Sequence, residues 1–114
     1  MTKILFICGK NRRRSPSAEE IFAGMDGVEV SSAGISADAE CPVSADLLEW
    51  ADKVFVMEQS QKKYLNAHFS HSLKDKKIVC LNIPDIYGYM QPELVAVLRT
   101  KVLPLLRRSN CVGI

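Results

Sequence analysis

The chain has 114 residues, of which 47% are hydrophobic and 25% charged, and we expect residues 1–114 to form one globular domain with its own core. No apolar stretch approaches the roughly 18 residues that span a bilayer, and no signal-peptide pattern opens the chain, so neither a membrane segment nor export is expected. A net charge of +2 is too small to indicate nucleic acid binding.

Apolar runs at residues 3–8, 53–57 and 77–81 predict short strands, of which the first is expected to be buried, and the alternation at residues 28–31 predicts another. Helical spacing is found at residues 15–25, after Pro42, at 58–69 and from Pro92 onward. Ser15 is the predicted N-cap of the first helix, and Pro104 is expected to kink or end the last one. The alternation predicts an α/β fold, a four-stranded parallel sheet in a single domain with helices on both faces.

The segment between the first strand and the first helix carries the most chemistry. It reads Cys8-Gly9-Lys10-Asn11-Arg12-Arg13-Arg14-Ser15-Pro16, which places a thiol and several cations at the carboxyl end of a strand, where ligands bind in such sheets. The N-terminus of the following helix favours an anion and stabilises a thiolate, and an arginine binds phosphate with two hydrogen bonds. The alternative, a buried small cysteine beside a solvated basic turn, leaves this order unexplained. The loop therefore predicts phosphate-ester chemistry through a cysteine.

This loop resembles the signature of the low-molecular-weight protein tyrosine phosphatases, Cys-x-Gly-Asn-x-Cys-Arg-Ser-Pro. The matching positions, in register, are Cys8, Asn11, Arg14, Ser15 and Pro16. Three later segments are similar to motifs of the same family and occur in the family's order. They are Ser32-Ala33-Gly34, the strand from Ala51-Asp52 to Met57-Glu58, and Ile83-Pro84-Asp85-Ile86-Tyr87-Gly88.

The resemblance implies a role for each matched residue. Cys8 would be the nucleophile that forms a phosphocysteine, Arg14 would bind the equatorial phosphoryl oxygens, and Asp85 would protonate the leaving group and then activate water. Ser15 would hydrogen-bond the thiolate, and Tyr87 would form an aromatic wall of the pocket. The rest of the loop would surround the phosphate, with Asn11 holding its shape: Gly9, Lys10, Asn11, Arg12 and Arg13. No metal and no cofactor is expected.

The chain also departs from the family pattern. Lys10 replaces a glycine and Arg13 replaces the second cysteine, so we expect no redox partner for Cys8 within the loop. Cys41, Cys80 or Cys111 would have to approach Cys8 to replace it. Ile86 stands where the family has proline, and the region 35–50 is shorter than in relatives, which predicts a more open pocket. Arg12 is expected to favour acidic sequences around the phosphorylated residue.

The predicted function is metal-independent hydrolysis of phosphotyrosine in proteins, through a phosphocysteine intermediate. The substrate would be a phosphorylated protein or a small aryl phosphate, and inorganic phosphate would be a product. Alternatives on the same fold are a phosphoarginine phosphatase, an arsenate reductase, which would need two further thiols, and a domain that binds phosphorylated ligands without hydrolysing them. Because a working thiol needs a reducing compartment, the expected location is the cytoplasm.

Overall fold

The first apolar run of the sequence forms the central strand of a parallel sheet. The computed structural model describes residues 2–9, 14–36, 38–73 and 76–111. Its strands lie in the order β2-β1-β3-β4, with bounds Thr2–Cys8 (β1), Val28–Gly34 (β2), Lys53–Val56 (β3) and Ile78–Cys80 (β4). All three neighbouring pairs are parallel. The predicted four-stranded parallel sheet is therefore confirmed.

Strand register places the ends of the strands, and with them the site. Cys8 pairs with Gly34 at the end of β2, and Ile7 pairs with Val56 at the end of β3. The carboxyl ends of these three strands therefore meet at one edge of the sheet. The residues that follow β1 and β3 in sequence are brought together there, as expected for a parallel sheet.

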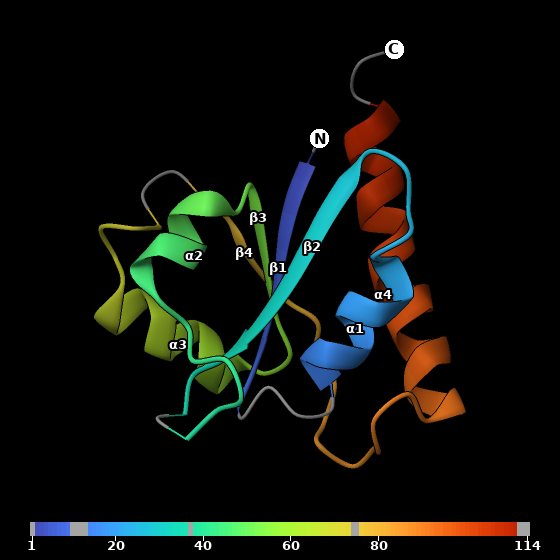
Figure 1. Ribbon diagram of the computed structural model, residues 1–114, viewed down its shortest axis with the longest axis horizontal. Coiled ribbons are helices and arrows are strands. Elements are labelled where there is room, and N and C mark those ends of the chain that lie inside the picture. Colours follow the sequence, from blue (N-terminus) through green and yellow to red (C-terminus); the bar gives the residue numbers. More distant parts are fainter. Residues whose placement is uncertain (1, 10–13, 37, 74–75, 112–114) are drawn as a thin grey trace.

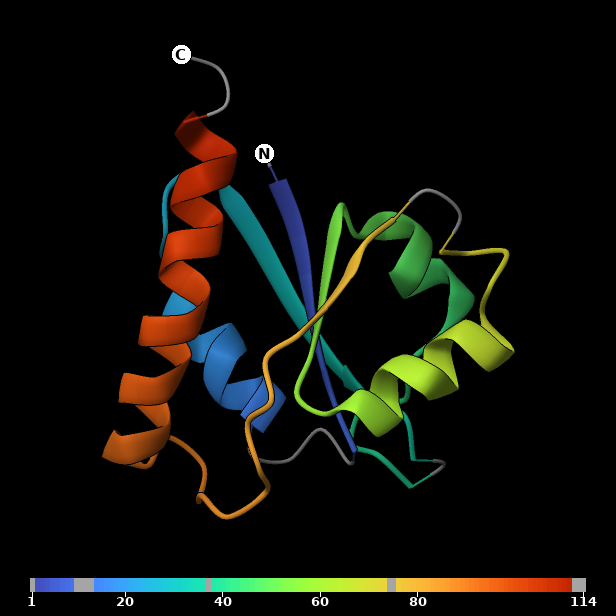
Figure 2. The ribbon, with the colours of Figure 1, turned by 180° about the vertical axis from the view of Figure 1, so that it is seen from behind.

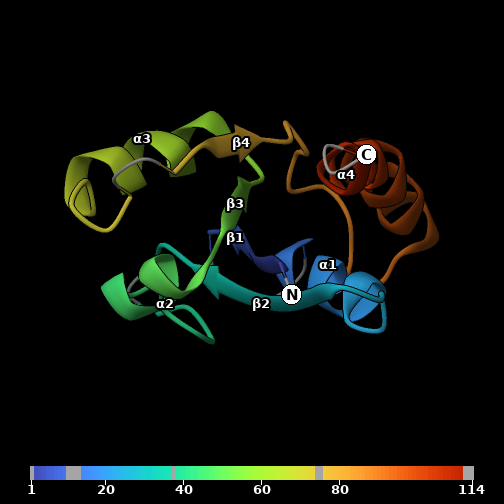
Figure 3. The same cartoon turned by 90° about the horizontal axis from the view of Figure 1, so that it is seen from above.

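Helices cover both faces of the sheet, also as predicted (Figure 1; Figure 3). On one face lie α1 (Arg14–Phe22) and α4 (Pro92–Cys111), and on the other lie α2 (Ala45–Trp50) and α3 (Gln59–His68). Alternate side chains of β1 point into the two cores, with Ile4, Phe6 and Cys8 on the α1/α4 side and Leu5 and Ile7 on the other. Burial on both faces explains why this strand reads as an unbroken apolar run.

Two local predictions need correction. Ser15 is not an N-cap, because α1 begins at Arg14 and the Ser15 side chain is buried inside the first turn. The last helix does not end at Pro104 but continues to Cys111. Pro104 is exposed, so the carbonyl group that loses its helical partner can face water, while Val102 and Leu106 on either side are buried in the core. Core packing therefore carries the helix past the proline.

The segment between β4 and α4 runs from the sheet past the start of α1 (Figure 2). Its first residues continue alongside β3, since the N–H groups of Leu81 and Ile83 donate to the carbonyls of Val56 and Met57. The segment then passes the first turn of α1 and enters α4. Among the described helices, none combines the length and apolarity needed to cross a membrane.

Candidate active site

Cys8 and Ser15 form the centre of the candidate site. Cys8 ends β1 and Ser15 lies in the first turn of α1, and both side chains are almost fully buried. The Cys8 Sγ and Ser15 Oγ atoms are 2.9 Å apart, and Ser15 Oγ is also 3.4 Å from the carbonyl oxygen of Ala33. A thiol can donate to the hydroxyl while the hydroxyl donates to Ala33, whereas a thiolate needs the hydroxyl proton to turn toward sulfur. The serine can therefore serve both states of Cys8.

The start of the loop is fixed by the chain that follows β2. The N–H groups of Ile35 and Ser36 donate to the carbonyls of Cys8 and Gly9, at 3.0 and 2.8 Å. These two bonds continue the β1–β2 ladder beyond the strands themselves. Gly9 therefore leaves the sheet in a defined direction, and the predicted loop starts from a rigid support.

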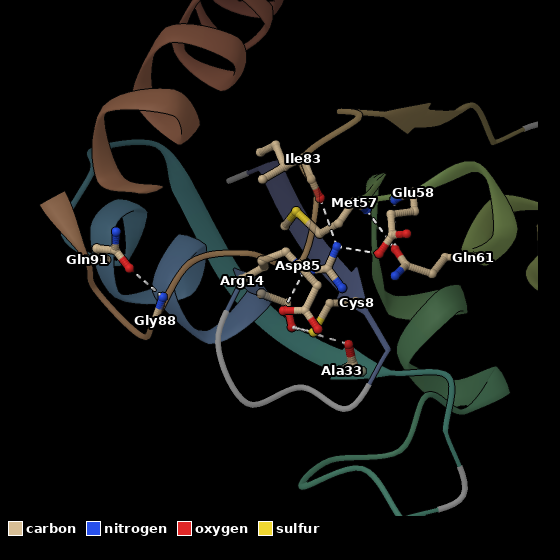
Figure 4. A network of polar contacts seen from close by, with 11 residues as sticks. Cys8, Arg14, Ala33, Met57, Glu58, Gln61, Ile83, Asp85, Gly88 and Gln91 are labelled. Carbon is tan, nitrogen blue, oxygen red and sulfur yellow. Dashed lines mark hydrogen bonds and ion pairs between the residues drawn. The ribbon is translucent and has the colours of Figure 1, made fainter. Parts of the chain in front are cut away.

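Arg14 presents its guanidinium beside Cys8 and is held there by two acceptors (Figure 4). Its Nη1 donates to Glu58 Oε1 at 2.5 Å and to the carbonyl oxygen of Ile83 at 2.8 Å. The Arg14 side chain is only 5% exposed, whereas that of Glu58 is 43% exposed. Because both Nη1 hydrogens are used, the Nε–Nη2 edge is the one that can bind a phosphoryl group with two parallel hydrogen bonds.

Glu58 is itself positioned by the turn between β3 and α3. The buried side chain of Gln61 accepts hydrogen bonds from the N–H groups of Met57 and Glu58, at 2.8 and 3.0 Å. This fixes the backbone that carries Glu58 at the end of β3, beside the end of β1. A carboxylate is thereby placed against the guanidinium of Arg14.

Asp85 approaches the same arginine from the opposite side. Its Oδ1 lies 3.8 Å from Arg14 Nε, and its side chain is 54% exposed. Figure 4 shows the Asp85 carboxylate beside Arg14. A half-exposed carboxyl group at the mouth of an anion site can exchange a proton with a leaving group or with water.

The loop that carries Asp85 is attached at its far end. Ser17 Oγ, in the first turn of α1, accepts a hydrogen bond from the N–H of Met90 at 2.8 Å. Gln91 accepts from the Gly88 N–H and donates to Glu93. The hydrogen bond from Gln91 and a backbone hydrogen bond lower the pKa of the Glu93 carboxyl. Glu93 is therefore held in its charged form in the first turn of α4, where a negative charge is favourable.

The structure describes most of the site residues that the sequence predicts, but not all of them. Cys8, Arg14, Ser15 and Asp85 are brought together as expected, and Tyr87 is half-buried against the core on the loop that carries Asp85. Whether Tyr87 lines the pocket stays a prediction. Four predicted loop residues lie outside the described part of the chain: Lys10, Asn11, Arg12 and Arg13.

Cys41 and Cys80 lie across the sheet from Cys8. Cys8 belongs to the α1/α4 core, whereas Cys41 and Cys80 pack against the core on the α2/α3 side. All three are thiols without a disulfide. The residues that the structure describes also contain no group of three or more His, Cys, Asp or Glu side chains that could hold a metal ion.

A family model describes the first two thirds of this architecture. The model for low molecular weight phosphotyrosine protein phosphatases matches residues 3–77, which include Cys8, Arg14, Ser15 and Glu58. The chain belongs to this family. The match stops before Asp85 and Tyr87, so the roles proposed for these two residues are supported only by the position of their loop. A search of curated protein sequences found no match.

Solved structures share the fold at low sequence identity. A low molecular weight tyrosine phosphatase from Streptococcus pyogenes aligns with a TM-score of 0.78 at 19% identity, over 95% of this chain and 93% of the other. The YwlE arginine phosphatase from Geobacillus stearothermophilus aligns with a TM-score of 0.74 at 20% identity, over 100% and 98%. The tyrosine phosphatase Wzb from Escherichia coli K30, in complex with phosphate, gives 0.73 at 17% identity, over 93% and 96%. A cysteine-based phosphatase scaffold is thus common to proteins with different substrates.

Sequence reasoning missed three residues that shape this site. Glu58 and Gln61 organise Arg14, and Ser17 attaches the Asp85 loop to α1. The sequence shows Met57-Glu58 at the end of a family-like motif but indicates no role for Glu58. The rule that parallel strands end at one edge of the sheet could have pointed to Glu58, since it follows the strand next to Cys8.

Proposed function

We propose that the protein hydrolyses phosphotyrosine in proteins, with Cys8 as nucleophile, Arg14 as phosphate-binding residue and Asp85 as general acid and base. Membership of the phosphatase family makes a phosphorylated substrate and a phosphate product the expectation. Residues 1–114 would act as one domain in the cytoplasm, where reducing conditions keep Cys8 a thiol.

One geometric observation carries the proposal. Two segments far apart in the sequence, residues 8–15 and the loop that carries Asp85, bring a thiol, a buried guanidinium and a half-exposed carboxyl group to one place, with Cys8 hydrogen-bonded to Ser15 and Asp85 beside Arg14. A domain that only bound phosphorylated ligands would use the arginine but would need neither the nucleophile nor the acid. The combination therefore favours turnover over binding.

In the first step, the Cys8 thiolate attacks phosphorus and the bond from phosphorus to the substrate oxygen breaks. Arg14 binds the equatorial oxygens through its Nε–Nη2 edge and stabilises their charge. Asp85, protonated, gives its proton to the leaving phenolate oxygen, so a neutral phenol departs. Asp85 Oδ1 lies 3.8 Å from Arg14 Nε. A phosphoryl oxygen that binds to this nitrogen would displace the carboxyl group, which could then turn toward the leaving oxygen.

In the second step, the phosphocysteine is hydrolysed. Asp85, now a carboxylate, removes a proton from water, whose oxygen attacks phosphorus as the sulfur–phosphorus bond breaks. Inorganic phosphate leaves, and the Cys8 thiolate is restored. Ser15 hydrogen-bonds this sulfur at 2.9 Å and would stabilise it as a leaving group.

Phosphoarginine is the second candidate substrate. YwlE arginine phosphatases are among the similar structures, and the α/β scaffold is shared over nearly the whole chain. The family model that matches this chain is that of phosphotyrosine protein phosphatases, which favours phosphotyrosine here. Arsenate reduction is disfavoured for the described residues, because Cys41 and Cys80 lie on the far face of the sheet.

A hydrolysis assay with chelator present tests the proposal. Wild type should release p-nitrophenol from p-nitrophenyl phosphate, Cys8→Ser should fall to background, and Asp85→Asn should lose about 10²- to 10⁴-fold in kcat. Peptides carrying phosphotyrosine, phosphoserine and phosphoarginine would then be compared by kcat/KM. Activity that survives Cys8→Ser would exclude the mechanism, and a preference for phosphoarginine would replace the substrate.

A further inference from the structure

Two large apolar side chains are exposed on the loop that carries Asp85. Among the described residues, Ile86 at 71% and Tyr89 at 54% are the large hydrophobic side chains that stand out as exposed. Both lie between β4 and α4, on either side of Tyr87, which packs against the core. Single exposed hydrophobic residues are common on protein surfaces, but two on one loop beside a reactive site indicate a binding surface.

The shape of this loop is fixed from both ends. Asn82 and Met90 have φ values of 55° and 56°, a left-handed conformation that is unfavourable for a side chain such as methionine. The Met90 N–H is bound by Ser17, and Asp85 lies beside Arg14. Ile86 and Tyr89 therefore stand between two attachments to the first turn of α1. Because the loop is held at both places, Ile86 and Tyr89 are kept exposed by its fixed conformation.

The charge around the two residues is also informative. Between residues 82 and 91, Asp85 is the one ionisable acid or base apart from the tyrosines, and the segment contains no lysine or arginine. Because Asp85 lies 3.8 Å from Arg14 Nε, its carboxyl group faces the guanidinium, and Ile86 and Tyr89 offer flanking side chains an apolar surface. This side of the site therefore fits an apolar partner.

We propose that Ile86 and Tyr89 form an apolar rim that binds hydrophobic side chains next to the phosphorylated residue of a protein substrate. The inference rests on the proposed function, because the phosphoryl group must reach Cys8 and Arg14 past Asp85. Ile86 follows Asp85 directly, so a polypeptide whose leaving oxygen faces Asp85 brings its neighbouring side chains over the rim. An extended chain advances about 3.3 Å per residue, which places the first two or three flanking residues within reach.

The test uses three phosphotyrosine peptides of equal length, with leucine and valine, serine and glycine, or aspartate and glutamate beside the phosphotyrosine. Wild type is compared with the double variant Ile86→Ser, Tyr89→Ser. The control is Ala96→Ser, an apolar-to-polar change on an exposed side of α4. Both rim residues are exposed, so the double variant should fold, which a thermal unfolding curve confirms.

Wild type should show a kcat/KM about 10-fold higher for the apolar peptide than for the neutral one, mostly through KM. The double variant should reduce this ratio to about 1, while the control keeps it. Equal kcat/KM for the apolar and neutral peptides in wild type, or an unchanged ratio in the double variant, would each overturn the rim. The acidic peptide tests Arg12 separately, and an acidic-to-neutral ratio that falls with the rim substitutions would also overturn the rim.

Calorimetric titration of the same peptides onto Cys8→Ser, with and without the two rim substitutions, separates the rim from the proposed function. Tighter binding of the apolar peptide that the rim substitutions abolish supports the rim even if wild type fails to hydrolyse any peptide. In that case the failure belongs to the proposed function. Equal affinity for the apolar and neutral peptides contradicts the rim whether or not turnover occurs.

Discussion

Arg14 is the residue on which the candidate site depends most. It is buried, and it divides its hydrogen-bond donors between a support and a substrate-facing edge. Glu58 and the Ile83 carbonyl hold Nη1, at 2.5 and 2.8 Å, while Nε faces Asp85. Glu58 contacts the guanidinium from the end of β3, so we propose that its part is to orient Arg14. A misplacement of about 1 Å can lower a rate by about 10²-fold.

This role predicts different outcomes for two changes at Glu58. Glu58→Ala removes the acceptor and should lower kcat/KM for p-nitrophenyl phosphate by roughly 10- to 100-fold, whereas Glu58→Gln keeps an acceptor oxygen and should recover most of the activity. The control is Glu20→Gln, on an exposed position of α1. Steady-state kinetics on the three variants decide it. Equal loss of activity in the alanine and glutamine variants would mean that Arg14 needs the negative charge of Glu58 and not merely a hydrogen-bond acceptor at that place.

At the level of elements, the Asp85 loop is held by α1. Ser17 is buried and accepts the Met90 N–H, which fixes a residue in the left-handed conformation. The loop therefore couples the acid to the same helix turn that carries Arg14. This arrangement keeps Asp85 near Arg14 although its own side chain is half exposed.

Ser17→Ala should loosen the loop and leave the core intact. We expect a loss of about 1 kcal/mol in the free energy of unfolding, because one buried hydrogen bond is removed. Hydrolysis of phenyl phosphate should fall several-fold more than that of p-nitrophenyl phosphate, since the more basic leaving group depends more on a placed acid. Ser70→Ala, on an exposed serine, is the control. Equal losses for the two substrates would argue against a link between Ser17 and Asp85.

The elements themselves could largely be predicted from the sequence. Strands such as β1 are buried on both faces and read as apolar runs, and the Cys8–Arg14 spacing stands out because both residues lie on one local segment. For Ser15 the local pattern predicts a helix cap, which is wrong, whereas the family resemblance predicts a hydrogen bond to Cys8, and the two side-chain atoms do lie 2.9 Å apart. The Arg14–Glu58 contact joins residues 44 apart, which only the sheet topology brings together.

On the scale of the whole molecule, the sheet separates the Cys8 thiol from those of Cys41 and Cys80. Cys8 lies in the α1/α4 core, and Cys41 and Cys80 lie against the α2/α3 core. The sheet lies between Cys8 and these two sulfurs, so a disulfide would require the chain around one of them to rearrange. The arrangement leaves Cys8 without a resolving thiol among them.

Oxidation should therefore proceed past the reversible stage. Hydrogen peroxide should convert Cys8 to the sulfenic and then the sulfinic acid, and dithiothreitol should restore only a small part of the activity. Cys41→Ser, Cys80→Ser should be inactivated and recovered to the same extent as wild type. Mass spectrometry of the treated protein identifies the product. A disulfide from Cys8 to Cys41 or Cys80, with poorer recovery in the double variant, would show that the sheet does not keep the thiols apart.

The most direct test of the central proposal is detection of the phosphorylated intermediate. Asp85→Asn, mixed with p-nitrophenyl phosphate and quenched in acid, should carry one phosphoryl group, because loss of the base slows hydrolysis of the phosphocysteine. Intact mass and peptide mapping should place it on Cys8, and Asp85→Asn combined with Cys8→Ala should carry none. A phosphoryl group on another residue, or turnover by Cys8→Ala at the wild-type rate, would contradict catalysis through Cys8.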